Sequence, residues 1–134
     1  MRNKSTLDFN WIQKTFRIRK EVIKIYKYLE FHAIKNDISK DILFDNIVNF
    51  SMDYINTYKP KISITKFDEL RDVKGFTLQE ETYSDLQKFY DNNFNHFLVA
   101  EFIECLIGIY SVKTLSQPEI KDNGLNTNFL SLSF

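Results

Sequence analysis

The chain has 134 residues, with 18 basic and 18 acidic side chains and a formal net charge of zero at pH 7. This length is typical of one compact domain with a sizeable core, and we expect residues 1–134 to form a single domain. Three glycines and two prolines exclude a turn-rich all-β fold and predict that helices dominate. The single cysteine excludes an internal disulfide framework and suits a reducing cytoplasm.

The charges are unevenly distributed along the chain. Residues 1–60 carry eleven Lys and Arg against seven Asp and Glu, a net of +4, and residues 61–134 carry the opposite, a net of −4. Such asymmetry indicates an anionic partner even when the total is neutral. Since we find neither a signal peptide nor an apolar run of roughly 18 residues, we expect no membrane partner. We expect a cytoplasmic protein, at the nucleoid or in a host cell, and the abundance of Phe, Ile, Asn and Lys suggests an AT-rich virus or plasmid.

The first predicted element is a strand over residues 14–19, in which apolar and polar side chains alternate. Phe16 and Ile18 form its apolar face. The opposite face carries Thr15, Arg17 and Arg19. Basic side chains on a strand can simply deter edge-to-edge aggregation. A second strand of the same kind would instead favour a face that binds an acidic partner.

Two helices should follow this strand. From Lys20 the apolar residues fall at helical spacing, and the helix should end near residues 36–39, where turn-forming side chains gather. Ser39 is a good N-cap for a second helix, whose apolar stripe runs to Tyr54. Residues 14–55 are therefore predicted to form a strand, a helix, a turn and a second helix.

The same order of elements is predicted again over residues 75–112. Residues 75–79 alternate, with Thr77 and Gln79 outward, and Asn95 takes the capping role of Ser39 before another apolar helix. Positions match at a spacing of 60 in the strands and at the starts of the first helices (Phe16 with Phe76, Glu21 with Glu81), and at a spacing of 56 in the second helices (Ile47 with Ile103, Tyr54 with Tyr110). We interpret this agreement as a degenerate internal duplication.

The remaining segments are harder to assign. Residues 56–74 are predicted as a connector, with room for a short strand and turn of its own. Residues 113–134 form a C-terminal tail that could be disordered, pack as an edge strand or join one molecule to another.

The two segments resemble the ribbon-helix-helix superfamily of Arc/MetJ type. FRIRKEVIKIYKYL with SKDILFDNIVNF is similar to one copy of that unit, and FTLQEETYSDLQKF with FLVAEFIECLIGIY is similar to a second. The resemblance implies a mostly α fold with a short antiparallel β-ribbon, in which two ribbon-helix-helix repeats of one chain form a pseudo-dimer. The usual glycine between the two helices is absent from both copies, and the second strand has no basic outward side chain.

A lone strand leaves its backbone polar groups unpaired, so we expect residues 15–19 to pair with 75–79. A two-stranded ribbon fits the major groove of DNA, where Arg reads guanine and Gln reads adenine. The predicted base contacts are Thr15, Arg17, Arg19, Thr77 and Gln79. Phosphate contacts should come from lysines beside the strands and from the second helices' N-termini. The predicted phosphate contacts are Lys14, Lys20, Ser39, Lys40, Lys74, Asn95 and His96.

No pattern in the sequence supports an enzyme. His32 and His96 lack further ligands at metal-site spacing. Cys105 has no recognisable His and acid partners, so it should be a buried small hydrophobe. Glu80 and Glu81 suit a first helical turn better than a catalytic pair. We therefore expect no catalytic residues, no metal, no cofactor and no small-molecule substrate.

The favoured function is a sequence-specific transcriptional regulator of double-stranded DNA, most simply a repressor. Because the two strands differ, the two halves of its DNA site should differ too. One alternative is a plasmid partition or conjugation accessory protein, which would bind repeated sites as a homo-oligomer on DNA. Another is a protein-interaction module that kept the fold and lost DNA binding.

Overall fold

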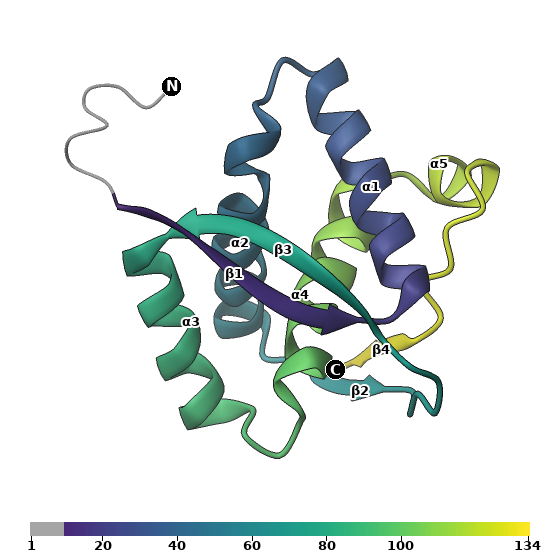
Figure 1. The fold of residues 1–134 in the computed structure, drawn as a ribbon. Helices are drawn as coiled ribbons and strands as arrows, with labels where there is room; N and C mark the ends of the chain where they lie inside the picture. The colour runs from purple at the N-terminus through teal and green to yellow at the C-terminus, as the bar shows by residue number, and fades with distance from the viewer. Residues whose placement is uncertain (1–9) are drawn as a thin grey trace.

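The computed structural model describes residues 10–134, which form five α-helices, a short 3-10 helix and four strands (Figure 1). In chain order these are β1 (Trp11–Ile18), α1 (Lys20–Lys35), η1 (Lys40–Ile42), α2 (Leu43–Tyr58), β2 (Lys61–Ile64), β3 (Asp72–Gln79), α3 (Glu80–Asn93), α4 (Val99–Thr114), α5 (Gln117–Asp122) and β4 (Leu130–Ser133). The predicted mostly helical chain with a short antiparallel ribbon is confirmed. A second two-stranded antiparallel sheet accompanies the ribbon.

The ribbon consists of β1 and β3, which are joined over their whole length from Trp11↔Gln79 to Ile18↔Asp72. The prediction that residues 15–19 pair with 75–79 is wrong in register. Both strands begin three residues earlier than expected, so Thr15 lies opposite Gly75 at the centre of the ribbon. The alternation of side chains has a period of two, so it does not choose between pairings that differ by an even number of residues.

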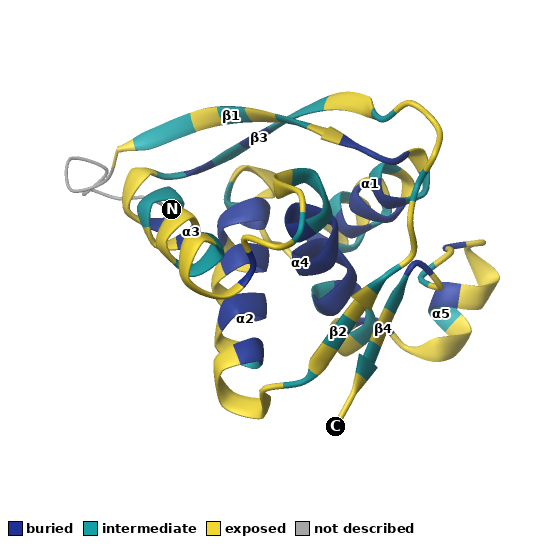
Figure 2. Cartoon of the chain, turned by 90° about the horizontal axis from the view of Figure 1, so that it is seen from below, coloured by how far each residue is buried: buried dark blue, intermediate teal, exposed yellow. Residues whose placement is uncertain are grey.

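The helices cover one face of the ribbon (Figure 2). From that face Ile18, Phe76 and Leu78 enter the core, where each is at most 2% exposed. The Phe76 ring stacks on Phe44 of α2 with centroids 4.2 Å apart and meets Tyr26 of α1 edge-on at 5.0 Å. These aromatic contacts fasten the ribbon to helices on both sides of the η1 turn.

The ends of the helices follow local chemistry. Asp37 adopts a left-handed conformation after α1, and the Ile38 N–H then donates to the Ala33 carbonyl at 2.8 Å, which satisfies an end group of the helix. At the end of α2, Lys59 also takes a positive φ, and Pro60 prevents the helix from continuing. Both turns send the chain back toward the core.

The second sheet joins two segments that sequence patterns left open. β2, within the predicted connector, pairs antiparallel with β4 of the C-terminal tail, from Lys61↔Ser133 to Ile64↔Leu130. Of the three alternatives for the tail, packing as an edge strand is the one observed. Figure 2 shows this sheet apart from the ribbon, near α5. Across residues 10–134, no helix is both long and apolar enough to cross a bilayer.

Candidate functional site

The candidate site is the outer face of the β1–β3 ribbon, on the side away from the helices (Figure 2). Gln13, Thr15 and Arg17 are exposed on β1, and alternation places them on one face. Their antiparallel partners are Thr77, Gly75 and Val73 in that order. Paired residues of a sheet point to the same face, so six positions form a strip along the ribbon. Two predicted base contacts of β1 and one of β3 therefore lie together.

Gln13 belongs to this strip although the sequence prediction omitted it. A Cβ added to Gly75 would meet the Gln13 amide nitrogen at 3.2 Å, so the Gln13 side chain lies over the glycine at the ribbon centre. We missed Gln13 because the strand was predicted to begin at Lys14. Extending the alternation one step back from Thr15 would have included it.

Arg19 does not point outward, and that prediction is wrong. Its side chain is 2% exposed, and its Nε donates to Oε1 of Glu104 in α4 at 3.1 Å. Its terminal NH2 group donates to the Thr65 carbonyl at 3.0 Å. Arg19 is the residue that links β1 to α1, so the chain has left the strand alternation there. A buried carboxylate needs a counter-charge, and Arg19 supplies one.

Gln79 lies at the other end of the ribbon, opposite Trp11 and directly before α3. Its side chain is half-buried, and its backbone N–H donates to Asp45 Oδ1 of α2 at 2.9 Å. The Arg19 N–H makes the related bond to Glu104 Oε2 of α4 at 2.8 Å. At each junction between a strand and a helix, the N–H is therefore held by a carboxylate from a helix in the other half of the chain.

Lys14 and Lys74 alternate with the outer residues and therefore lie on the inner, helix-facing side of the ribbon. Each pairs with a phenylalanine of the inner face, Lys14 with Phe76 and Lys74 with Phe16. The Lys14 ammonium lies 4.7 Å from the centroid of the Tyr83 ring, and that of Lys74 lies 5.2 Å from the centroid of Tyr26. These contacts direct both side chains toward aromatic rings of the helices. The predicted contacts of Lys14 and Lys74 with DNA phosphates stay a prediction.

Ser39 and Lys40 lie at the start of η1, and Lys40 comes to the edge of β3. The Ser39 hydroxyl accepts the Asp41 N–H at 3.2 Å and so caps η1, whereas α2 itself begins later, at Leu43. Lys40 is exposed and lines one surface hollow together with Lys74 and Thr77. The structure thus brings Lys40, one of the predicted phosphate contacts, beside the ribbon. Lys20 is exposed at the first position of α1, next to the end of β1.

Asn95 and His96 do not occupy the corresponding place at α4. The prediction that Asn95 caps this helix is wrong, because α4 begins at Val99 and the Leu98 N–H donates to the Glu101 carboxylate at 2.9 Å. The Asn95 amide instead donates to the Asp91 carbonyl at 3.1 Å, at the end of α3. Burial of Phe94, whose ring lies 5.2 Å from that of Phe102, holds the chain in a turn for these extra residues.

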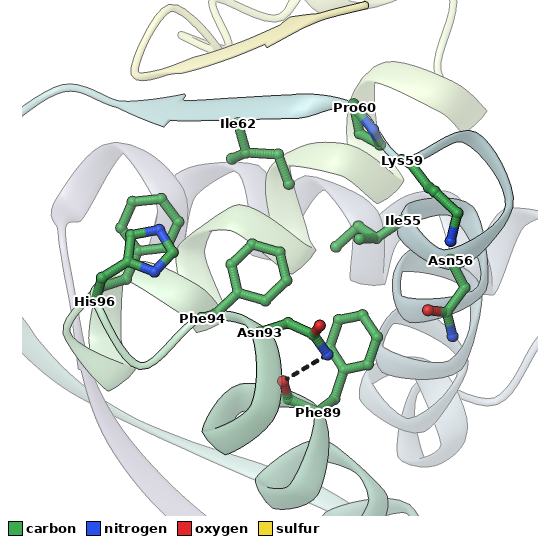
Figure 3. Close-up of a pocket in the computed structure, with 10 residues that line it drawn as sticks. Ile55, Asn56, Lys59, Pro60, Ile62, Phe89, Asn93, Phe94 and His96 are labelled. Atoms are coloured by element: carbon green, nitrogen blue, oxygen red, sulfur yellow. Dashed lines mark hydrogen bonds between the residues drawn. The ribbon is translucent and has the colours of Figure 1, made fainter.

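A separate surface hollow lies between the end of α2, β2 and the turn after α3 (Figure 3). It has a volume of about 350 Å³, and no residue of the ribbon lines it. Its lining side chains are Ile55, Asn56, Lys59, Pro60, Ile62, Phe89, Asn93, Phe94, His96 and Phe97. They include neither a carboxylate nor a thiol.

Side chains able to hold a metal ion are not gathered at any place in the described chain. Residues 10–134 contain no cluster of three or more His, Cys, Asp and Glu side chains suited to a metal ion. Cys105 is fully buried, as predicted, and burial raises the pKa of its thiol to about 12. On α1, the Tyr28 hydroxyl donates to Glu119 at 2.6 Å, a hydrogen bond that lowers the pKa of Glu119 and raises that of Tyr28.

Comparison with known proteins gives no relative, since no family model, no curated protein and no solved structure matches this chain.

Proposed function

We propose that this protein is a sequence-specific DNA-binding regulator, most simply a transcriptional repressor, that inserts the β1–β3 ribbon into the major groove. The observation that carries the proposal is the outer face of the ribbon. There Gln13, Thr15 and Arg17 are exposed, while the inner face is packed on helices. A two-stranded ribbon fits the major groove, and these side-chain types can hydrogen-bond to base edges.

We further infer that the chain is a tandem ribbon-helix-helix pseudo-dimer. In support, β1 is followed by α1 and α2 as β3 is followed by α3 and α4. The pairing is centred on Thr15↔Gly75, two residues that are themselves 60 positions apart, like Phe16 and Phe76. The crossed bonds from Arg19 to Glu104 and from Gln79 to Asp45 agree with an approximate two-fold axis through that centre.

The two halves of the DNA site should differ. On one side of the centre the outer face presents Arg17 opposite Val73, and on the other side Gln13 opposite Thr77. Arg makes bidentate contacts with guanine, Gln does so with adenine, and apolar side chains contact the methyl group of thymine. We therefore expect a guanine in one half-site and an adenine in the other.

The first test selects duplexes from a random library, with competitor DNA and about 0.15 M salt present. We expect enrichment of an asymmetric motif. A palindromic motif would contradict pairing within one chain and indicate ribbons formed between chains. If folded protein enriches no motif, the regulator proposal is wrong, and a protein-interaction module becomes the better hypothesis.

The variant Arg17→Ala tests base reading directly. We expect it to weaken binding to the selected duplex by about 1–3 kcal/mol and to relax the preference for guanine in that half-site. Fluorescence anisotropy on the selected duplex and on single-base variants would measure both effects. The exposed Lys61 of β2, changed to Ala, serves as the control. An equal loss for Arg17→Ala on every duplex would instead assign Arg17 to phosphate contact.

A further inference from the structure

A row of lysines follows the outer surface of α1. Lys20, Lys24 and Lys27 are all exposed, and their spacing of four and three residues puts them on one side of the helix. Together with Ile23 of α1 and Asp72 of β3 they line one surface hollow of about 280 Å³. We call Lys20, Lys24 and Lys27 the lysine row. It extends about 10 Å along the helix axis.

The lysine row continues the basic end of the ribbon. Asp72, which shares its hollow, pairs with Ile18, the last residue of β1, and α1 leaves the ribbon at this end (Figure 1). Arg17 is the adjacent outward residue of β1. Positive charge therefore extends from the outer face of the ribbon onto the neighbouring helix.

The charges of the lysine row are not neutralised by ion pairs. Over residues 10–134, the ion pairs within 4.0 Å involve only Arg19, Arg71 and His32 as the basic partners. The Lys24 ammonium does donate to the Gly124 carbonyl at 3.1 Å, but a carbonyl carries no formal charge. Asp72 is the one carboxylate that lines the hollow with the three lysines.

The opposite end of the ribbon has no such row. Sixty residues after Lys20, Lys24 and Lys27, helix α3 carries Glu80, Ser84 and Gln87. Its first turn is acidic, since Glu80 and Glu81 are both exposed there. An anionic partner lying along the ribbon would therefore be attracted at the Arg17 end and repelled at the Gln79 end.

We propose that the lysine row is a second DNA contact, which binds the phosphate backbone flanking the half-site under Arg17. This inference rests on the proposed function, because it takes the ribbon to lie in the major groove. Lysine ammonium groups recognise phosphates irrespective of sequence, so the row adds affinity without adding base preference. The DNA footprint then extends further on the Arg17 side than on the Gln79 side.

The test compares the variant Lys20→Gln/Lys27→Gln with the control Lys61→Gln/Lys121→Gln, whose lysines are also exposed but lie on β2 and α5. Lys24 stays unchanged because it holds the Gly124 carbonyl. The two variants have the same net charge, because each replaces two lysines with glutamine. Each protein is titrated with the selected duplex, lengthened either on the Arg17 side or on the Gln79 side. Anisotropy at several salt concentrations gives the slope of log K against log salt.

We expect the slope to become less steep by about two for Lys20→Gln/Lys27→Gln, since each lost phosphate contact contributes about 0.9. The wild type should bind more tightly when the Arg17-side flank is lengthened, and this variant, which keeps only Lys24 of the lysine row, should gain less. Base preference should stay unchanged. If both variants show the same slope and the same response to either flank, the inference is overturned.

The outcome is distinguishable from failure of the proposed function. If the wild type binds all duplexes alike and the lysine-row variant still loses salt dependence relative to the control, the phosphate contact holds while the regulator proposal fails. If the selected motif depends on Arg17 and the two lysine variants behave alike, the regulator proposal holds while the lysine row is only a solvated helix face.

Discussion

Glu104 of α4 holds the residue after β1 and the segment before β3 against this helix. Its side chain is fully buried and accepts hydrogen bonds from the Nε groups of Arg19 at 3.1 Å and Arg71 at 3.0 Å. The Phe67 ring lies 4.8 Å and 5.2 Å from the two guanidinium groups. Such a cluster contributes little when complete but is costly to break, because each partner is left as a buried charge.

We predict that Glu104→Ala lowers the free energy of unfolding by about 3–5 kcal/mol. The substitution leaves the Arg19 guanidinium buried without a counter-charge and removes the acceptor of the Arg19 N–H. Urea unfolding followed by circular dichroism would measure the change, with the exposed Glu69→Ala as the control. A loss as small as that of the control would show that the cluster relaxes or takes in water.

Cys105 makes stability sensitive to alkaline pH. Burial raises the pKa of its thiol from 9.0 to about 12, so above the ordinary value the unfolded chain loses a proton that the folded chain keeps. The contribution of the Cys105 thiol to the free energy of unfolding is therefore fully present below about pH 9. It falls as the pH rises toward 12, by up to about 1.4 kcal/mol per pH unit.

We expect Cys105→Ala to be less stable than the wild type at about pH 8 but to lose less stability between about pH 8 and pH 10. Urea unfolding of both proteins at the two pH values measures this difference. Other groups that titrate at alkaline pH affect both proteins equally, so their effect on the free energy of unfolding cancels in the comparison. Parallel losses in the two proteins would mean that the thiol reaches solvent in the folded state.

At the scale of elements, the second sheet depends on a close approach to α4. A Cβ on Gly108 would lie 2.9 Å from Leu130 Cδ2 and 3.0 Å from Phe129 Cζ, so the glycine lets β4 and the residue before it pack against the helix. The Thr65 N–H then donates to the Phe129 carbonyl at 2.8 Å beside the β2–β4 pair. This sheet holds the segment that leads into β3.

We predict that Gly108→Ala loosens the β2–β4 sheet locally. Overpacking costs about 1–3 kcal/mol, whereas alanine favours the helix by about 1 kcal/mol, so the two effects partly offset in global stability. Amide hydrogen exchange should show reduced protection in β2 and β4 with the ribbon unchanged. Gly75→Ala is the matched control, since its new methyl would meet only the flexible end of Gln13. Unchanged exchange in β2 and β4 would show that Phe129 and Leu130 adjust freely.

At the scale of the whole molecule, one chain supplies both strands of the ribbon. β1 and β3 satisfy each other's backbone ladder and are separated by α1, α2 and the second sheet's first strand. A second chain is therefore not needed to complete the candidate interface. The two strands carry different outer residues, which a symmetric dimer of identical chains cannot present.

We accordingly expect one chain to bind one minimal duplex site. Native mass spectrometry of the complex, at protein concentrations above the dissociation constant, would give the stoichiometry. Arg17→Ala is the appropriate comparison, because it should weaken the complex without changing its composition. Two chains on a minimal site would contradict the intramolecular ribbon as the unit that enters the groove.

The sequence by itself was enough to predict the order of the two ribbon strands and of the two helices after each strand, but not β2, α5 and β4. The alternation predicted over residues 14–19 and 75–79, and the helical spacing after each strand, indicate which side chains face the core, because such a pattern depends only on neighbouring residues. It predicted the ribbon, the helices that follow each strand, and the outward position of Arg17. It also indicated that Cys105 is buried.

Only the tertiary structure decided the features that depend on partners distant in the chain. Arg19 continues the alternation of Arg17, yet it is buried because Glu104 lies against it, 85 residues later in the sequence. Contacts between distant segments also determine four other features: the ribbon register, the place of Gln13 over Gly75, the late start of α4 after Asn95, and the pairing of β4 with β2. The apolar periodicity of a segment indicates which of its side chains are buried. Strand register and ion pairs depend instead on contacts between segments.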